Sequence, residues 1–143
     1  MKKLISFSIL TVSLFLASCA SDKKDDPLAP TTSSGDERDK FVATWSVNET
    51  SALLGGSSNH TVTISKSSAI SSEILINNFY GLTSSSVRAS VNNSIVTIPY
   101  QSVSGGFVVG GKGTMNNATT INLTYTTAIG TDRDSCSAIY TKQ

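Results

Sequence analysis

The chain has 143 residues, a formal net charge of +1 and 15% charged residues, a size that allows one small folded domain beside any processed segment. Because the charge is nearly balanced, the sequence offers no basic surface for nucleic acid, and its one histidine disfavours histidine-based metal sites. The abundance of serine and threonine favours strands and turns over helices.

Residues 1–18 have the organisation of an export signal. Lys2 and Lys3 form a positive start, and the apolar run 4–15 that follows is too short to span a bilayer. Residues 16–19 (Leu-Ala-Ser-Cys) resemble the lipobox of bacterial lipoproteins. The resemblance implies that the signal is removed, and that the Cys19 thiol carries acyl chains which attach the protein to a membrane. An ordinary secretory signal with a nearby cysteine is the alternative interpretation.

Residues 19–39 have the composition of a flexible tether. Charged residues, proline, serine and threonine dominate, and the apolar side chains are too few to form a core. Residues 24–26 (Lys-Asp-Asp) resemble the acidic export signal of Bacteroidetes surface lipoproteins, which implies lipid anchoring in the outer membrane with the domain exposed at the cell surface. A solvated spacer is the other interpretation of the same run.

Residues 40–143 alternate apolar and polar side chains with a period of two, which predicts an all-β domain. The predicted strands lie at 41–47, 60–64, 74–79, 87–91, 95–99, 107–115, 119–126 and 136–141. Because the links are short and rich in Asn, Gly and Ser, we expect neighbouring strands to pair antiparallel as a single meander. A closed barrel and a two-sheet β-sandwich both fit this pattern.

The first predicted strand favours the barrel. Residues 40–45 (Lys-Phe-Val-Ala-Thr-Trp) resemble the opening strand of the calycin or lipocalin-like barrels, whose signature is Gly-x-Trp, with Ala43 in place of the glycine. The resemblance implies a closed barrel of eight or so strands, in which Trp45 closes the floor beneath a basic side chain, here Lys142. It extends to small lipoprotein domains of Bacteroidetes. The alternative interpretation of Trp45 is a core aromatic residue of another β-fold.

Residues 106–113 (Gly-Phe-Val-Val-Gly-Gly-Lys-Gly) match the spacing of a phosphate-binding loop, but Gly113 replaces the Ser or Thr that would hold magnesium. A phosphate-binding loop also needs a helix to follow it, whereas the next residues have the pattern of a strand and a turn. We therefore interpret the segment as a bent, glycine-bearing strand and expect no nucleotide partner.

The side chains able to perform chemistry are few. His60 has no recognisable nucleophile or orienting acid, and we expect it at a strand edge with a satisfied hydrogen bond. Residues 132–134 (Asp-Arg-Asp) are interpreted as a solvated turn, because the arginine would repel a cation. Cys136 is expected to face the core. The sequence thus predicts no catalytic residue, no metal site, no cofactor and no enzymatic activity.

Two functions fit these observations. The first is a non-catalytic binding protein, in which a small hydrophobic or amphipathic ligand enters the barrel mouth. The candidate floor and ligand-lining residues are Trp45, Phe107, Val109, Tyr125 and Lys142. The second is a surface interaction module with a filled barrel that binds a protein or a glycan. Because ligand pockets occupy several hundred Å³, the volume of the cavity discriminates between them.

Overall fold

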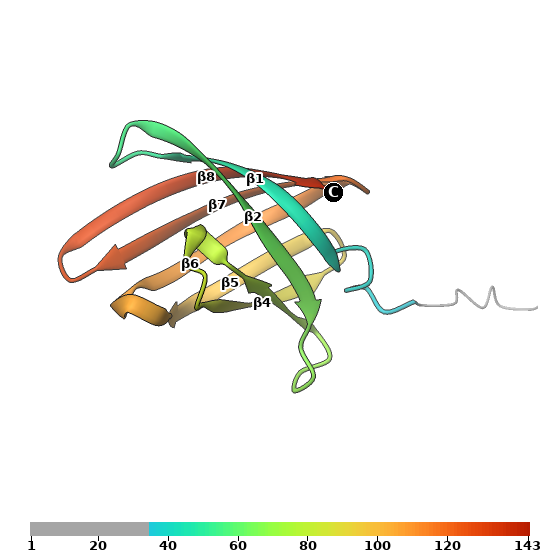
Figure 1. Ribbon diagram of the computed structural model, residues 1–143. Helices are drawn as coiled ribbons and strands as arrows, with labels where there is room; N and C mark the ends of the chain where they lie inside the picture. The colour runs from blue at the N-terminus through green and yellow to red at the C-terminus, as the bar shows by residue number, and fades with distance from the viewer. Residues whose placement is uncertain (1–34) are drawn as a thin grey trace, which may run out of the picture. The chain divides into compact units, whose positions relative to one another are not determined.

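A computed structural model describes residues 35–143 (Figure 1). The strands are β1 (Ala43–Ser51), β2 (Gly56–Lys66), β3 (Glu73–Asn77), β4 (Ser86–Asn92), β5 (Ile95–Ser102), β6 (Val108–Asn117), β7 (Thr120–Ile129) and β8 (Asp132–Lys142). Two short 3₁₀ segments, η1 (Phe79–Gly81) and η2 (Ser104–Gly106), precede β4 and β6. Within the described range, no helix has the length and apolarity needed to cross a bilayer. The predicted signal, the lipidation site Cys19 and nearly all of the predicted tether lie outside the described residues.

The strands form one closed antiparallel barrel. Each strand pairs with its neighbours in sequence, and β1 also pairs with β8, which completes the ring. At the closure, Trp45 on β1 lies opposite Val62 on one side and Lys142 on the other. The predicted all-β meander and its closure are confirmed, and the two-sheet sandwich is wrong. Residues 63–66 of β2 pair with β3, whereas residues 56–62, toward the other end of the strand, pair with β1 alone.

The barrel has two ends, which we call the floor and the mouth. The floor carries the β2–β3, β4–β5 and β6–β7 connections, together with the start of the described chain and its C-terminus (Figure 1). The mouth carries the other four connections, including η1 and η2. β1 runs from the floor to the mouth, and β8 returns from the mouth to the floor.

Two of the tight hairpins use residues that tolerate positive φ. Asn93 follows β4 with a φ of 51°, and Gly130 follows β7 with a φ of 58°. Each belongs to a two-residue link, as predicted for a hairpin that contains Asn or Gly. The turn predicted at 116–117 lies instead at 118–119, because β6 continues through Asn117.

Glycines shape β6 where it lies against β7. A Cβ atom at Gly111 would collide with Tyr125 and with the backbone beside it, and one at Gly113 would lie 2.6 Å from Cδ1 of Leu123. At Gly111 and Gly113, the space inside the barrel is therefore filled by residues of β7. Residues 108–113 belong to β6, which reaches β7 through a hairpin, so the interpretation as a glycine-bearing strand is confirmed for this part of the segment 106–113. Gly106 belongs to η2.

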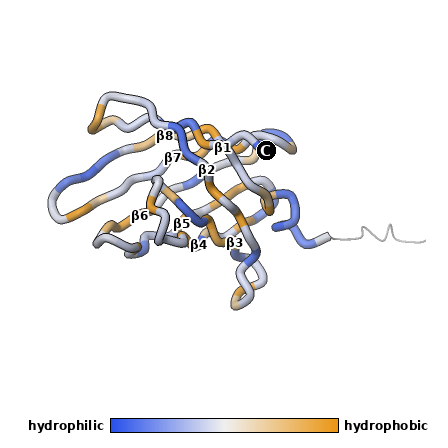
Figure 2. The backbone as a smooth tube through the Cα atoms, viewed as in Figure 1, coloured by the Kyte–Doolittle hydropathy of each residue, from blue (hydrophilic) through white to orange (hydrophobic). Residues whose placement is uncertain are grey.

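The core occupies the barrel interior, where apolar side chains from successive strands interdigitate. Figure 2 shows apolar and polar residues alternating along the strands, as the period-two pattern requires. The largest fully buried side chains are Trp45, Tyr140, Phe41, Phe79, Ile64, Ile74, Ile76, Val47, Val62, Val87 and Val109. This set is dominated by large aromatic and branched side chains, which fill most of the interior.

The ordered domain begins before the predicted boundary at residue 40. The Arg38 guanidinium donates to three backbone carbonyls within the segment 67–73, at 3.0–3.2 Å, and so ties the entering chain to the β2–β3 connection. Asp36 accepts from Arg38 and pairs with Lys66, and these donors hold the pKa of the Asp36 carboxyl well below its usual range. Composition alone placed this charged run in the tether, because its ordering comes from partners distant in sequence.

Two further local predictions are wrong. The predicted third strand includes Phe79, which belongs instead to η1, because β3 ends at Asn77 and the next residue, Asn78, adopts a φ of 64°. Residues 132–134 were interpreted as a solvated turn, but the tight link at 130–131 lets them begin β8. Asp134 consequently points into the barrel and is 4% exposed.

Candidate functional site

The barrel interior changes from apolar at the floor to polar at the mouth. The inward residues, taken from floor to mouth, are Trp45, Val47, Glu49 and Ser51 on β1, Tyr140, Ala138, Cys136 and Asp134 on β8, and Leu123, Tyr125 and Thr127 on β7. On the neighbouring strand β2, Ser58 is paired with Glu49. Paired residues of adjacent strands lie on the same side of the sheet, so Ser58 shares the side of Glu49. On the side of the barrel formed by β1, β2, β7 and β8, the polar side chains of the interior therefore gather at the mouth.

The floor is closed around Trp45. Its indole Nε1 donates to the backbone carbonyl of Phe41 at 2.9 Å, and its side chain has no exposed surface. Lys142, from the last strand, places its Nζ 5.5 Å from the centre of the indole and donates to the carbonyl of Lys40 at 3.2 Å. The hydrogen bonds and the cation–π contact hold the indole in place at the floor.

Glu49 and Tyr125 form a buried pair in the middle of the barrel. The Tyr125 hydroxyl donates a short hydrogen bond to Oε2 of Glu49, and both side chains are 4% exposed. Burial, followed by the hydrogen bond to Glu49, raises the pKa of Tyr125 far above its ordinary value. The phenol is therefore neutral and acts as the donor to the carboxylate.

Asp134 is the second interior carboxylate, and four donors surround it. Its Oδ2 accepts from the hydroxyls of Ser51 at 2.6 Å and Tyr80 at 3.2 Å, and from the Cys136 thiol at 3.3 Å. Its Oδ1 accepts from the amide of Leu53 at 2.9 Å. Burial alone would raise the pKa of Asp134, but these donors together outweigh that effect and the pKa lies below its ordinary value.

Cys136 faces the interior, as predicted, and is 3% exposed. Burial, together with the hydrogen bond that the thiol donates to Asp134, raises the pKa of Cys136 to about 12. Because the thiolate is the reactive form, this side chain is unsuited to act as a nucleophile at neutral pH.

The η1 segment reaches into the mouth and packs against its aromatic residues. Phe79 is fully buried, with its ring centre 4.6 Å from that of Tyr125. The ring of Tyr80 is tilted against that of Phe107, with the ring centres 5.9 Å apart. Tyr80 has a φ of 56°, a conformation that a bulky residue rarely adopts. Such strain, of about 1–3 kcal/mol, is typical of functional segments, and here it points the Tyr80 hydroxyl at Asp134.

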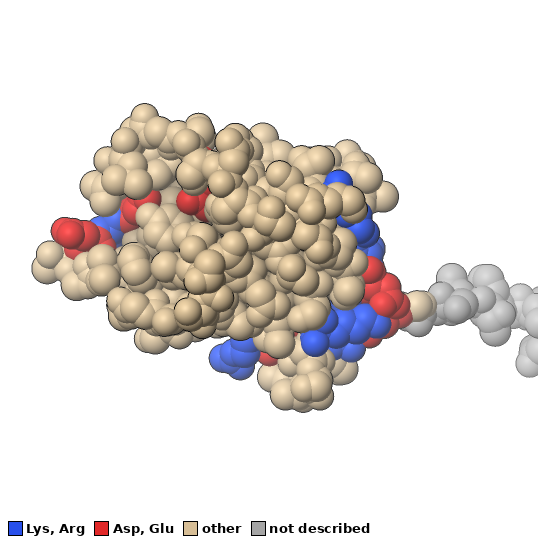
Figure 3. Space-filling model, in the orientation of Figure 1, with Lys and Arg blue, Asp and Glu red and all other residues tan. Residues whose placement is uncertain are grey.

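A recess of about 360 Å³ opens at the mouth between β1, β2 and η1. It is lined by Glu49, Ser51, Leu54, Gly56, Ser57, Ser58 and Tyr80. Figure 3 shows acidic residues inside a hollow beneath the β1–β2 hairpin, whereas many other charged residues gather at the floor end. The recess thus combines a carboxylate and several hydroxyls with an aliphatic and an aromatic side chain.

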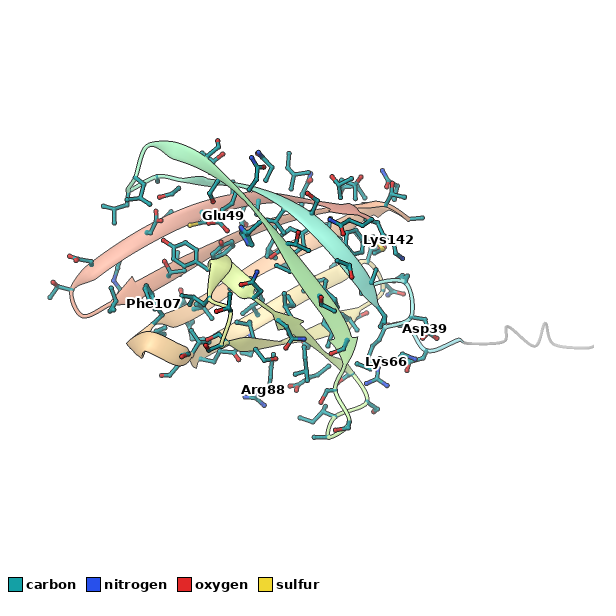
Figure 4. All side chains as sticks on the ribbon, viewed as in Figure 1. Asp39, Glu49, Lys66, Arg88, Phe107 and Lys142 are labelled. Atoms are coloured by element: carbon teal, nitrogen blue, oxygen red, sulfur yellow. The ribbon has the colours of Figure 1, made fainter. Side chains whose placement is uncertain are left out.

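The structure divides the predicted site residues between the two ends. Trp45 and Lys142 lie together at the floor, whereas Phe107 lies at the mouth, outside the strands and against Tyr80 (Figure 4). Val109 and Tyr125 face the interior and are buried. These five residues therefore do not converge on one pocket.

The residues that line the recess were not singled out from the sequence, and this includes Glu49. Alternation could have found it, because Glu49 continues the inward series of Trp45 and Val47. The hydrogen bond expected for His60 is not observed, since its Nε2 is buried without a partner among the described residues.

The chain resembles a solved structure of a redesigned β-barrel. The two align with a TM-score of 0.56 and 13% sequence identity, over 76% of this chain and 96% of that chain. No family model matches the chain, and no curated protein matches it. At this identity the likeness shows the fold alone, which is an eight-stranded antiparallel β-barrel closed on itself.

Proposed function

We propose that this protein is a non-catalytic binding protein that holds a small amphipathic ligand in the mouth of its barrel. The observation that carries the proposal is the recess of about 360 Å³, at the lower end of the volumes that ligand pockets occupy. Its lining offers hydrogen-bonding groups from β1 and β2 beside the ring of Tyr80 and the side chain of Leu54. Such a lining suits a ligand with one polar end and one apolar end.

The filled floor limits the size of the ligand. Trp45, Phe41 and Tyr140 occupy the lower interior and are at most 2% exposed, so a ligand would reach only the mouth half. This arrangement is expected of a small barrel, whose interior is only wide enough for side chains or for one small ligand. The absence of catalysis is supported by the raised thiol pKa of Cys136 and by Asp134, whose oxygens already accept four hydrogen bonds.

The proposed location follows from the sequence. Cys19, in its lipobox-like context, would carry the acyl chains that anchor the mature protein in the outer membrane, with the barrel at the cell surface in the manner of lipocalin-like lipoproteins of Bacteroidetes. Labelling of intact cells with a reagent that does not cross membranes tests this arrangement. Labelling of the barrel only after lysis would contradict surface exposure.

A second candidate function, binding of a glycan or a protein, is favoured by the outer face. A shallow depression of about 660 Å³ lies over β5 to β8 and includes Tyr100, Gly110 and Lys112. The Tyr100 side chain is 75% exposed, and its ring covers Gly110, so that it offers an aromatic surface on the outside of the sheet.

Native mass spectrometry of the purified protein after incubation with a membrane-lipid extract tests the first proposal. We expect a discrete added mass that disappears on denaturation, and no such mass in Ser58→Phe, because this substitution fills the recess opposite Glu49. A bare polypeptide mass for the wild type would contradict the proposal and would favour the outer face.

A further inference from the structure

The two interior carboxylates differ in how well they are satisfied. Asp134 accepts from four donors, whereas the hydrogen bonds of the described residues give Glu49 a single donor, Tyr125, on Oε2. Glu49 is only 4% exposed, and it lines the recess. The other oxygen of Glu49 accepts no hydrogen bond from the described residues, and it is not among their fully buried unpaired atoms, so it opens into the recess.

No basic side chain of residues 35–143 forms an ion pair with Glu49. At the floor, the ion pairs of this part of the chain join Asp36 with Arg38 and Lys66, and Asp39 with Lys66, and on the wall Arg88 pairs with Glu73. A buried carboxylate is costly unless it is paired and fully hydrogen-bonded. Asp134, close by at the same end, adds negative charge rather than compensating it.

The recess therefore suits a ligand that carries a positively charged hydrogen-bond donor. An organic cation meets this requirement better than a metal ion does. Calcium takes six or more oxygen ligands, and the described residues contain no group of three His, Cys, Asp or Glu side chains placed to hold a metal. The Tyr80 ring and the Leu54 side chain line the same recess and suit an apolar body.

From these observations we infer that the ligand of the recess is a small organic ammonium ion with an apolar body, whose ammonium group donates to the Glu49 carboxylate. This inference rests on the proposed function of the recess, and it adds the chemical class of the ligand. Ser51 and Ser58 lie beside Glu49, and their hydroxyl oxygens can accept hydrogen bonds from the remaining N–H groups of the ammonium ion.

Isothermal titration calorimetry of the purified protein tests the inference with three probes of similar shape and different charge: phenethylamine, phenethyl alcohol and hydrocinnamate. We expect the amine to bind about 10- to 100-fold more tightly than the alcohol, as for a charge-assisted hydrogen bond, and the anionic acid not to bind. In Glu49→Gln, the affinity for the amine should fall to that for the alcohol, whose own affinity should not change.

Two controls keep the result interpretable. Asp132→Asn removes an exposed carboxylate at the same end of the barrel and should leave the preference for the amine intact. Cooperative unfolding, followed by the fluorescence of Trp45, shows whether Glu49→Gln folds. If it does not, Ser58→Phe serves as the second variant, because it blocks the recess while retaining the carboxylate.

The outcomes separate the two proposals. Equal affinity for the amine and the alcohol, lost in Ser58→Phe, would overturn the inference about charge and leave the binding function standing. Tighter binding of the anion would overturn the same inference. No binding of any probe, together with a bare mass after incubation with the lipid extract, would overturn both proposals.

Discussion

The hydrogen bond between Tyr125 and Glu49 should contribute strongly to the stability of the barrel. Tyr125→Phe removes the hydroxyl and retains the ring, which is buried and packs on Phe79, so the variant loses the donor without opening a large cavity. Glu49 is then left without its one protein donor. Because leaving a buried charged acceptor unsatisfied costs about 2–3 kcal/mol, we expect the free energy of unfolding to fall by that amount.

Unfolding in guanidinium chloride, followed by tryptophan fluorescence, measures this loss. Trp45 is the single tryptophan of the chain and is fully buried, so its emission reports the opening of the barrel. The expected loss is a sizeable share of the 5–15 kcal/mol typical of a domain, and it corresponds to a decrease in Tm of about 10 °C. Glu49→Gln retains an acceptor for the Tyr125 hydroxyl, so its free energy of unfolding should fall by less than about 1 kcal/mol.

Tyr100→Phe is the matched control. Its hydroxyl has no hydrogen-bond partner in the described residues and its side chain is 75% exposed, so the unfolding free energy should stay within about 0.5 kcal/mol of the wild type. If Tyr125→Phe is no less stable than Tyr100→Phe, the buried pair does not support the barrel and the reasoning is refuted.

Three further predictions concern acid stability, thiol reactivity and strand packing. The pKa of Asp134 lies below its unfolded value, so this carboxylate contributes stability above about pH 4 that is lost as the pH falls through the folded pKa. Urea unfolding across the acid range should show Asp134→Asn to be less stable at neutral pH and less sensitive to acid; an unchanged acid slope would count against this. Site-resolved mass spectrometry should find alkylation of Cys136, whose pKa is raised to about 12, at least about 100-fold slower in the folded than in the unfolded protein. Equal rates would show that the thiol is accessible. In calorimetric scans, Gly111→Ala should lower the free energy of unfolding by about 3 kcal/mol or more, because its Cβ would meet backbone atoms. Gly110→Ala should lower it by less than about 1 kcal/mol, because its Cβ would meet only the Tyr100 ring, which can turn toward solvent. Similar losses in the two variants would contradict this placement of the glycines.

Much of the fold could be predicted from local patterns. Strands with one buried face show an alternation of apolar and polar residues in the sequence. Two-residue hairpins favour residues that tolerate positive φ, such as Asn93, so their positions can also be predicted. Closure was predicted from the resemblance around Trp45, and the structure indeed pairs this residue with Lys142 across the β1–β8 seam.

The candidate site was harder to predict because it depends on which strand ends meet. Glu49 and Asp134 each continue the inward alternation of their own strand, but nothing in either segment shows that both point into the same mouth. Tyr80 belongs to a short segment set by left-handed backbone conformations, which hydrophobic patterning does not reveal. Arg38 is ordered by carbonyl groups about 30 residues away in the chain, beyond the reach of local composition.

The central claim is that the mouth recess is the ligand site, and heteronuclear NMR during a titration with phenethylamine tests it most directly. We predict that amide shifts concentrate around Ser51, Ser58 and Tyr80, while the amides of Trp45 and Lys142 at the floor stay in place. Shifts confined to the outer face, or no shifts at all at saturating probe, would contradict the claim.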